Sequence, residues 1–445
     1  MLTKLYVKNY RAFEKVSIPL GKLNLFFGPN NSGKSSLISA ITMFAQNLQS
    51  TYYDSEVLLS GKFEELGSFY DIVHGNDEGK KIEIGIGADV MVPLRTNTKN
   101  AHGRRIQKTV LQRKSGYSEI TIGYNKTRHE VRLLATETRL NEDNAILKTG
   151  RNRLGRHVVE YSKGFTGLNK EQLNQLLTIR TLLPVLQLFK FSTISFDEYE
   201  KMRNLRYYLS GFRENMHDVE FIGPFRTNPQ RFYQLTGESF NSVGKYGEKA
   251  LGILVNDIKR KGKTKKNLLK DVAKWMRDAE IASNIFIQSF TDRYFEVRVR
   301  NFYTNEDENL SDVGYGCSQI IPILVAGFNL TPGGILIVEE PEIHLHPKAQ
   351  AELGSLLKTF YERDIQLFVE THSEHLLIRL QSHIAKGDVD PKDVNVFYVD
   401  PAGKNKGKEI TRIPIGKDGY FEKPWPKGFF PERLQEAERL AGLAD

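Results

Sequence analysis

The sequence has almost no cysteine and no long hydrophobic run. The chain has 445 residues, and Cys317 is its single cysteine. An internal disulfide is therefore excluded, and we expect a reducing, cytoplasmic location. No apolar run reaches the roughly eighteen residues of a membrane-spanning helix, and the opening Met1–Val7 is typical of a strand rather than of an export signal. We therefore expect no membrane partner.

Internal repeats and sustained heptads are also missing from the sequence, which excludes a solenoid and a long coiled-coil arm. The chain is long enough for two or three domains. A hydrophobic content of 40% and a charged content of 26% are typical of a soluble globular protein. The formal net charge of +9 permits contact with a polyanion but does not require it.

The basic residues gather in two places. The run 257–266 holds six positive charges in ten positions, and a looser cluster is formed by Arg104, Arg105, Lys108, Arg113 and Lys114. Such clusters attract a nucleic-acid backbone through counterion release. A charge run is also commonly a solvated loop. Both interpretations, DNA contact and a solvated loop, stay open for the first cluster.

The segment Gly28–Ser35 fills every fixed place of the phosphate-binding pattern G-x-x-x-x-G-K-[ST] and directly follows the apolar run Leu23–Phe27. A helix predicted from Lys34 to about Gln46 would turn its free N–H groups and positive dipole end toward the ligand. Lys34 supplies a charge for the β- and γ-phosphates, and the Ser35 hydroxyl suits Mg²⁺. The sequence predicts a nucleoside triphosphate site. Its binding residues are Gly28, Asn30, Asn31, Ser32, Gly33, Lys34, Ser35 and Ser36.

Two later strands end in polar residues. The run Gly334–Pro341 is a β-branched strand that ends in Glu339 and Glu340, where open α/β sheets bind their ligands. We predict that Glu339 binds the metal and that Glu340 is the general base for an attacking water; an ordinary surface turn is the alternative. The run 365–373 ends in a polar trio whose His372 can contact a γ-phosphate or the attacking water.

Four parts are expected along the chain. Residues 1–90 and 216–400 form the two halves of one nucleotide-binding head, because the phosphate loop and the carboxylate strand lie in different halves. Residues 91–215 are expected to be an inserted, mainly helical arm, with a helical stretch near Lys170–Phe189. Residues 401–445 form a C-terminal extension.

Together, the loop at 28–35, the run Glu339–Pro347 and the trio 371–373 resemble the ABC-type ATPase superfamily. The acidic and histidine-rich run looks like the branch that contains OLD-family proteins and stand-alone bacterial ATPases. The opening Tyr10–Phe13 ahead of the loop is similar to RecF and structural-maintenance-of-chromosomes (SMC) heads. The segment Gly416–Phe430 resembles a domain of unknown function found at the end of many such proteins.

The resemblance implies an α/β fold: an ABC-type ATPase head with a mixed central sheet flanked by helices, an antiparallel β subdomain and the inserted arm. ATP and Mg²⁺ are the implied cofactors, with Ser35 and Glu339 on the metal. A signature segment at 310–319, with Gly314, Gly316 and Ser318, would contact the γ-phosphate of a partner head; a plain helix cap is the alternative. Arg11 would reach the nucleotide, as an equivalent arginine does in related heads; an ordinary exposed arginine at a strand end is the alternative. The γ-phosphate-sensing glutamine is not identified, and Gln46 and Gln49 are candidates.

We therefore expect a dimeric ATP-hydrolysing switch, in which two heads close over two ATP molecules and reopen after hydrolysis promoted by Glu340 and His372. A homodimer is implied, with a higher oligomer left open. The resemblance suggests the ATPase component of a bacterial anti-phage defence system that acts with a separate nuclease or toxin. A DNA repair or recombination clamp that binds DNA directly is the alternative. The long insertion and Glu339 argue against a transporter motor.

Overall fold

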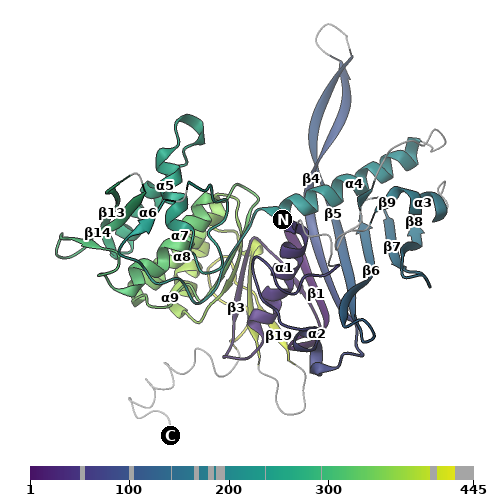
Figure 1. Ribbon diagram of the computed structural model, residues 1–445, viewed down its shortest axis with the longest axis horizontal. Helices are drawn as coiled ribbons and strands as arrows, with labels where there is room; N and C mark the ends of the chain where they lie inside the picture. The colour runs from purple at the N-terminus through teal and green to yellow at the C-terminus, as the bar shows by residue number, and fades with distance from the viewer. Residues whose placement is uncertain are drawn as a thin grey trace. The chain divides into compact units, whose positions relative to one another are not determined.

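The computed structural model describes residues 1–50, 56–99, 105–141, 143–164, 170–178, 185–186, 196–235, 237–291, 293–400 and 408–425. They fall into two compact units (Figure 1). Unit 1 takes Met1–Leu20 and Ser39–His217, and unit 2 takes Gly21–Ile38 and Asp218–Asp445. The predicted phosphate loop and the predicted carboxylate strand therefore both belong to unit 2. The predicted segment 1–90 is divided between the units.

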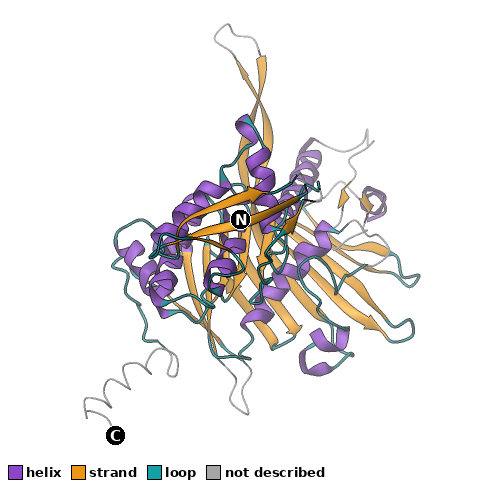
Figure 2. Cartoon of the chain, turned by 60° about the vertical axis from the view of Figure 1, so that its left-hand side comes forward, coloured by secondary structure: helices purple, strands orange, loops and turns teal. Residues whose placement is uncertain are grey.

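Unit 1 is built on an antiparallel sheet in the order β2-β1-β4-β5-β6-β7-β8. Its strands are β1 (Leu2–Tyr10), β2 (Phe13–Pro19), β4 (Ile82–Lys99), β5 (Arg105–Asn125), β6 (Glu130–Leu140), β7 (Ala145–Arg151) and β8 (His157–Lys163). β4 and β5 extend past the other strands as a two-stranded ribbon (Figures 1 and 2). The long helix α4 (Phe196–His217) packs against both of them.

The expectation of a mainly helical arm is wrong. The described part of residues 91–215 consists mostly of strands. Of the helical stretch expected near Lys170–Phe189, the described residues form α3 (Lys170–Leu176) and the short strands β9 (Leu177–Thr178) and β10 (Val185–Leu186), and residues 179–184 and 187–189 lie outside the described residues. Buried and partly exposed positions mix along β6, β7 and β8. Half-exposed strands of this kind give a weak hydrophobic signal in the sequence. Two further short helices of unit 1 are α2 (Phe69–Ile72) and η1 (His74–Asn76).

Unit 2 contains a six-stranded sheet in the order β11-β16-β17-β3-β18-β19. Its strands are β11 (Val219–Ile222), β16 (Ile335–Glu339), β17 (Gln366–Glu370), β3 (Leu23–Phe27), β18 (Val394–Val399) and β19 (Ile410–Ile413). The pairings from β11 through β18 are parallel, and β19 is antiparallel. The predicted mixed central sheet is confirmed. β3, β17 and β18 are buried along their whole length, as the continuous apolar runs in the sequence predict.

Asn24 is a fully buried polar side chain in the middle of this sheet. Its amide donates to the carbonyls of Gly21 at 2.8 Å and Leu367 at 3.1 Å, and its oxygen accepts from the Gly21 N–H at 2.8 Å and the Asn395 amide at 3.1 Å. The polar group is therefore satisfied. It ties the start of β3 to both neighbouring strands, β17 and β18.

Helices and a second sheet complete unit 2. The helices are α5 (Ala250–Lys259), η2 (Gly262–Thr264), α6 (Leu268–Asp278), α7 (Tyr315–Asn329), α8 (Pro347–Glu362), α9 (Glu374–Ala385) and η3 (Pro391–Asp393). The second sheet is antiparallel and contains β12 (Tyr233–Gln234), β13 (Ala282–Ser289), β14 (Tyr294–Asn301) and β15 (Asp307–Asn309). α1 (Lys34–Gln49) begins in unit 2, at the phosphate loop, and continues into unit 1.

Only part of the predicted C-terminal extension is described. β19 and the segment up to Trp425 are placed, and the Trp425 ring packs edge-on against Phe27, with ring centroids 5.7 Å apart. Residues 401–407 and 426–445, which include the end of the Gly416–Phe430 segment, lie outside the described residues.

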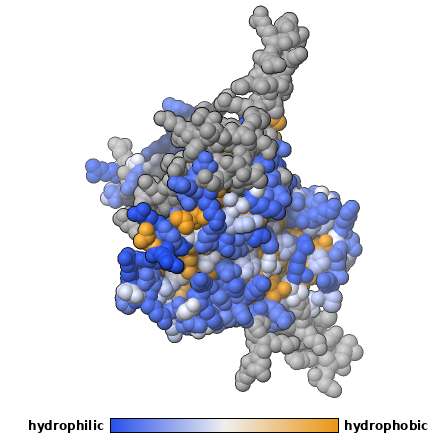
Figure 3. Space-filling view, turned by 90° about the vertical axis from the view of Figure 1, so that its right-hand side faces the viewer, coloured by the Kyte–Doolittle hydropathy of each residue, from blue (hydrophilic) through white to orange (hydrophobic). Residues whose placement is uncertain are grey.

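On the face shown in Figure 3, hydrophilic residues dominate and hydrophobic residues form small separate patches. Scattered apolar residues of this kind are normal on a folded protein. No helix within the described ranges is long and apolar enough to cross a lipid bilayer.

Gly327 on α7 allows a tight contact with α8. A Cβ atom added at Gly327 would lie 2.1 Å from the ring of Phe360, which is fully buried. Alanine normally improves helix stability by about 1 kcal/mol over glycine, but overpacking a core typically costs about 1–3 kcal/mol. We predict that Gly327→Ala lowers the melting temperature by several degrees in thermal unfolding. The double variant Gly327→Ala/Phe360→Leu should be more stable than the sum of its parts, and strict additivity would contradict the contact.

Candidate functional site

The loop Gly28–Ser35 joins β3 to α1 in unit 2. Gly28 has φ 143°, and a Cβ there would lie 2.3 Å from the carbonyl oxygen of Val399, so only glycine fits. Gly33 has φ 110°, and the Ser36 N–H donates to its carbonyl at 3.0 Å. Asn31 also adopts a positive φ, of 62°, and accepts at its carbonyl from Lys408 at 2.7 Å. The backbone thus has the open curve that a phosphate requires.

The side chains of this loop differ sharply in burial. Asn30, Asn31 and Ser35 are exposed, whereas Ser32 is fully buried. Among the residues that the structure describes, the Ser32 hydroxyl has no hydrogen-bond partner. A buried hydroxyl without a partner is unfavourable, so it is the kind of group that a bound phosphate can satisfy.

Lys34 is folded over the loop. Only 3% of its side chain is exposed, and its ammonium donates to the carbonyls of Gly28 at 2.9 Å and Pro29 at 3.1 Å. It also lies 3.5 Å from a carboxylate oxygen of Glu370, at the end of β17. The Ser35 hydroxyl donates to the other oxygen of Glu370 at 2.8 Å. Both cofactor-directed side chains of the loop therefore meet at Glu370.

Glu370 is a residue that the sequence analysis missed. Glu370 lies within the run 365–373. In the sequence, only the trio 371–373 of that run indicated a functional role. Burial raises the pKa of its carboxyl, and the Lys34 charge and the Ser35 hydrogen bond lower it again. A charge at the end of a fully buried strand is tolerated because it is paired.

The carboxylates of β16 lie beside it. In the parallel register, Glu339 is opposite Glu370, and Glu370 is opposite Phe26 of β3. The Glu340 N–H donates to the Glu370 carbonyl at 2.7 Å, and Glu340 has φ 47°, so the chain turns sharply away from the strand there. The structure thus brings Lys34, Ser35, Glu339 and Glu340 to one edge of one sheet.

Arg226 stabilises the turn at Glu339 and Glu340 through hydrogen bonds to its backbone. Its side chain is 7% exposed and donates from Nη2 to the carbonyls of Glu339 at 2.7 Å and Glu340 at 3.1 Å. Burial lowers its pKa to about 10, and the charges of Glu342, Glu340 and Glu339 oppose that shift. The segment 223–226 gave no chemical signal in the sequence. Arg226 now has a defined contact, with the backbone of both predicted carboxylate residues.

Glu342 binds the backbone and side chain of the residues that follow β17. Its carboxylate accepts from the Thr371 hydroxyl at 2.7 Å and from the His372 N–H at 2.6 Å. Burial raises the pKa of Glu342, and these two hydrogen bonds lower it. The backbone at His372 is therefore set by a residue of the turn after β16. Glu342 belongs to the run Glu339–Pro347, but the sequence indicates no role for it.

His372 is half-buried beside this cluster. Its pKa is lowered by burial and then by the Lys34 charge, while Glu340 raises it. The imidazole is therefore neutral at neutral pH. Within the described ranges there is no group of three or more His, Cys, Asp or Glu side chains that could hold a metal ion unaided, so a cation here would need oxygen atoms of the nucleotide as well.

The predicted signature segment forms the start of α7. Gly314 precedes the helix and is exposed, as is Tyr315. A Cβ at Gly316 would lie 2.6 Å from the His344 carbonyl, so this glycine permits close packing on the loop after β16. Ser318 is 6% exposed, and its hydroxyl donates to the Tyr315 carbonyl at 3.0 Å. The expected contact of Ser318 with the γ-phosphate of a partner head stays a prediction.

Three other candidate residues belong to unit 1. The Arg11 guanidinium lies 4.0 Å from Glu64. Gln46 donates to the Leu58 carbonyl at 3.3 Å, and Gln49 donates to the Met216 carbonyl at 2.6 Å. Each of the three thus has a described partner within unit 1.

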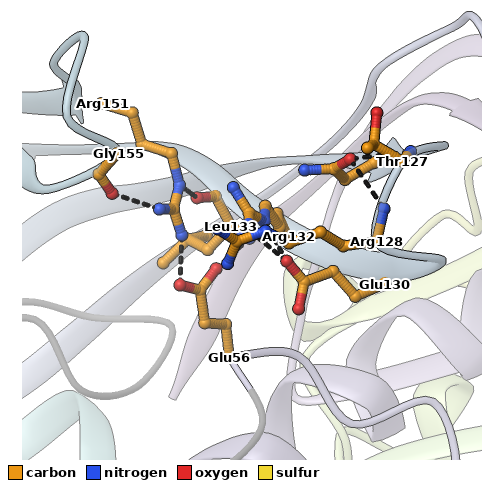
Figure 4. Close-up of polar contacts among 9 residues, drawn as sticks. Glu56, Thr127, Arg128, Glu130, Arg132, Leu133, Arg151 and Gly155 are labelled. Atoms are coloured by element: carbon orange, nitrogen blue, oxygen red, sulfur yellow. Dashed lines mark hydrogen bonds and ion pairs between the residues drawn. The ribbon is translucent and has the colours of Figure 1, made fainter.

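A hollow of about 630 Å³ in unit 1 is lined by several arginines (Figure 4). Arg151 donates to Glu56 and to the carbonyls of Leu133 and Gly155, and Arg132 pairs with Glu130. Figure 4 shows Arg151 turned toward Glu56 and Arg132 turned toward Glu130.

Comparison with known proteins identifies the family of the chain. A family described as "AAA ATPase domain" matches residues 1–177 and 226–377, which together make up most of the chain. The chain belongs to the AAA ATPase domain family. It is a P-loop enzyme that hydrolyses ATP, as the loop and the two strand ends predicted. A second family, described as "Protein of unknown function (DUF3696)", matches residues 389–440, which confirms the predicted C-terminal domain of unknown function.

Individual relatives are more distant. The OLD nuclease of Thermus scotoductus is 44% identical over 43 residues, which is 10% of this chain and 8% of that protein. The SMC head domain from Thermotoga maritima covers 93% of this chain and 99% of its own, at 12% identity and a TM-score of 0.37. The Smc head domain bound to the C-terminal domain of ScpA, derived from Pyrococcus furiosus, covers 99% and 98% at 11% identity and a TM-score of 0.38. Scores this low carry no further argument.

The neighbours of His372 predict how its pKa responds to substitution. Removing a positive charge favours the protonated imidazole, so Lys34→Met should raise the pKa of His372, and Glu340→Gln should lower it. NMR titration of histidine-labelled protein, with His372→Asn to assign the signal, measures both shifts. Lys22→Met, which removes a lysine paired with Asp364, should leave the signal unchanged. Identical titration in all variants would refute the arrangement.

Proposed function

We propose that this ATPase is a magnesium-dependent dimeric switch, in which two heads close over two ATP molecules and reopen after hydrolysis. One observation carries the proposal: the phosphate-loop side chains Lys34 and Ser35 and the carboxylates of Glu339, Glu340 and Glu370 converge at the carboxyl edge of one parallel sheet. Ligands of open α/β sheets bind at this edge.

The nucleotide would be held by the loop. The positive-φ backbone at Gly28, Asn31 and Gly33 and the unsatisfied Ser32 hydroxyl fit a phosphate. Lys34, which now lies on loop carbonyls, would bind the β- and γ-phosphates. The oxygens of Ser35 and Glu339 suit Mg²⁺, which takes few protein ligands and several from phosphate and water. When bound, the cation would neutralise charge on the phosphates.

Hydrolysis would depend on Glu340 and His372. Glu340 leaves the line of β16 at a positive φ, and Arg226 holds its carbonyl, so its side chain is positioned apart from Glu339. We assign it as the base that accepts the proton of the attacking water. The neutral imidazole of His372, oriented through Glu342, would donate a hydrogen bond to the γ-phosphate.

The second head would contribute the start of α7. Gly314 and Tyr315 are exposed there, and free N–H groups at a helix start attract an anion. Closure over ATP would then give the closed state a higher affinity for ATP than the open state, which is the condition for a ligand-driven switch. A homodimer is the simplest assembly, and a higher oligomer is compatible with it.

The biological role that we propose is the ATPase component of a bacterial anti-phage defence system, with a separate nuclease or toxin protein as effector, in the cytoplasm. The local likeness to an OLD nuclease supports a link to nuclease-based systems, although it spans 8% of that protein. Cys317, the single cysteine, is buried, which agrees with a reducing compartment.

Glu340→Gln tests the assigned base. Loss of the base should reduce ATP turnover by about 10²–10⁴-fold while nucleotide binding persists. ATP should then trap the variant as a dimer, which light scattering after size-exclusion chromatography would detect. Lys34→Ala should lose ATP binding and the dimer together. Glu362→Gln, a surface glutamate paired with Lys358, is the matched control and should behave as the wild type. Undiminished turnover in Glu340→Gln would remove the assignment.

A DNA-binding clamp is the second candidate function, and the basic lining of one groove in unit 2 supports it. The groove has a volume of about 880 Å³, lies between α6 and β13, and is lined by Lys265, Lys270, Lys274, Arg277 and Phe286. Two acidic residues, Asp257 and Asp278, also line it, but Asp257 is buried and accepts from the N–H groups of Lys266 and Leu268. Exposed cations beside an aromatic ring suit a nucleic-acid strand.

The looser basic cluster of unit 1 is a weaker candidate for DNA contact, because Arg113 pairs with Asp89 and Lys114 pairs with Asp143. Arg104 and the side chains of Arg105 and Lys108 lie outside the described residues.

The double variant Lys270→Gln/Lys274→Gln tests this groove. If both lysines contact phosphates, the slope of log affinity against log salt should fall in magnitude by about two. Fluorescence anisotropy with a labelled oligonucleotide across a salt series measures the slope. Lys386→Gln/Lys392→Gln removes the same charge from exposed positions outside the groove and should leave it unchanged. Equal slopes in both variants would exclude the groove as a DNA site.

A further inference from the structure

We propose that Glu370 makes the nucleotide site selective for the magnesium complex of a nucleoside triphosphate over the metal-free nucleotide. The inference rests on the proposed roles of Lys34 and Ser35. It concerns a residue of β17 rather than of the phosphate loop or of the carboxylate strand β16. The ligand class is a triphosphate with a divalent cation.

The geometry places one carboxylate against both cofactor-directed groups of the loop. One oxygen of Glu370 lies 3.5 Å from the Lys34 ammonium, and the other accepts from the Ser35 hydroxyl at 2.8 Å. The side chains of Glu370 and Lys34 are 7% and 3% exposed. Because water is largely excluded from this pair, its charges interact strongly with the phosphates and the cation of a nucleotide bound in the loop.

Glu370 opposes a metal-free triphosphate in two ways. It offsets the Lys34 charge that would otherwise attract the phosphates, and it places a negative charge beside a polyanionic ligand. Lys34 must also exchange its contact with Glu370 for a contact with phosphate. The carboxylate stays at the end of a buried strand, whose backbone is fixed by pairing on both sides.

The same carboxylate favours the metal complex. The Ser35 hydroxyl donates its proton to Glu370, which leaves the oxygen lone pairs available to a cation. A carboxylate that accepts from a ligand in this way orients it and strengthens it as an electron donor. Its negative charge also attracts the cation. Glu370 thus penalises the nucleotide alone and favours the nucleotide with its metal.

A purely structural Glu370, which only neutralises Lys34 or completes the strand end, makes a different prediction. Its replacement would change nucleotide affinity by a similar factor with and without metal. The ratio of the two dissociation constants, metal-free over magnesium-bound, separates the two roles, because any uniform loss of affinity cancels in the ratio.

The experiment measures binding of a non-hydrolysable ATP analogue by calorimetry at pH 8, in EDTA and in excess Mg²⁺. In Glu370→Gln the ratio should fall about tenfold or more, within the range of ordinary coupling between ligands, with tighter binding in EDTA. Glu370→Asp keeps the charge and should stay near the wild-type ratio. Glu342→Gln is the matched control, because it removes a carboxylate from the same sheet edge whose hydrogen bonds go to Thr371 and His372.

An unchanged ratio in Glu370→Gln, with a wild-type melting temperature, would overturn the inference. Glu370→Ala removes the same charge and decides the matter if the glutamine variant unfolds. An equal fall of the ratio in Glu342→Gln would also overturn it, since the effect would then belong to any carboxylate at this edge. Failure of the proposed function looks different, because the wild-type protein would then not bind the analogue with Mg²⁺ at all.

Discussion

The parallel pairing of β3, β17 and β16 is the constraint on which the site depends. Parallel strands deliver their carboxyl ends to one edge of a sheet, and the register places Phe26, Glu370 and Glu339 in one row. A slip of one residue would turn each of these side chains to the opposite face. The chemistry of the loop is therefore determined by strand register as much as by the loop sequence.

Buried polar groups fix that register and the turns beyond it. Asn24 ties β3 to both neighbours at the start of the strands. At the other end, Arg226 holds the carbonyls of Glu339 and Glu340, and Glu342 holds the backbone at His372. Each of these side chains bonds to main-chain atoms. Since an unpaired buried polar group is costly, these contacts specify one backbone arrangement around the carboxylates.

The nucleotide head could be predicted from the sequence because its signals are local. The loop at Gly28–Ser35 has a fixed spacing, and the strands that end at Glu339 and Glu370 are short apolar runs with polar ends. The strands between residues 91 and 163 escaped prediction because they lack a regular alternation of polar and apolar residues; in β6, three consecutive apolar residues are followed by four polar ones. Arg226 and Glu370 escaped for another reason. Their partners lie far away in the sequence, and no spacing rule connects them.

The chain order of unit 2 has a consequence for synthesis. The Asn24 amide of β3 donates to the carbonyl of Leu367, which is made 343 residues after it. At about 5–20 residues per second, roughly twenty seconds or more separate the two. Residues up to His217, which complete unit 1, are made first. The nascent polypeptide thus carries the apolar strand β3 without its sheet neighbours β17 and β18 while the intervening residues are translated.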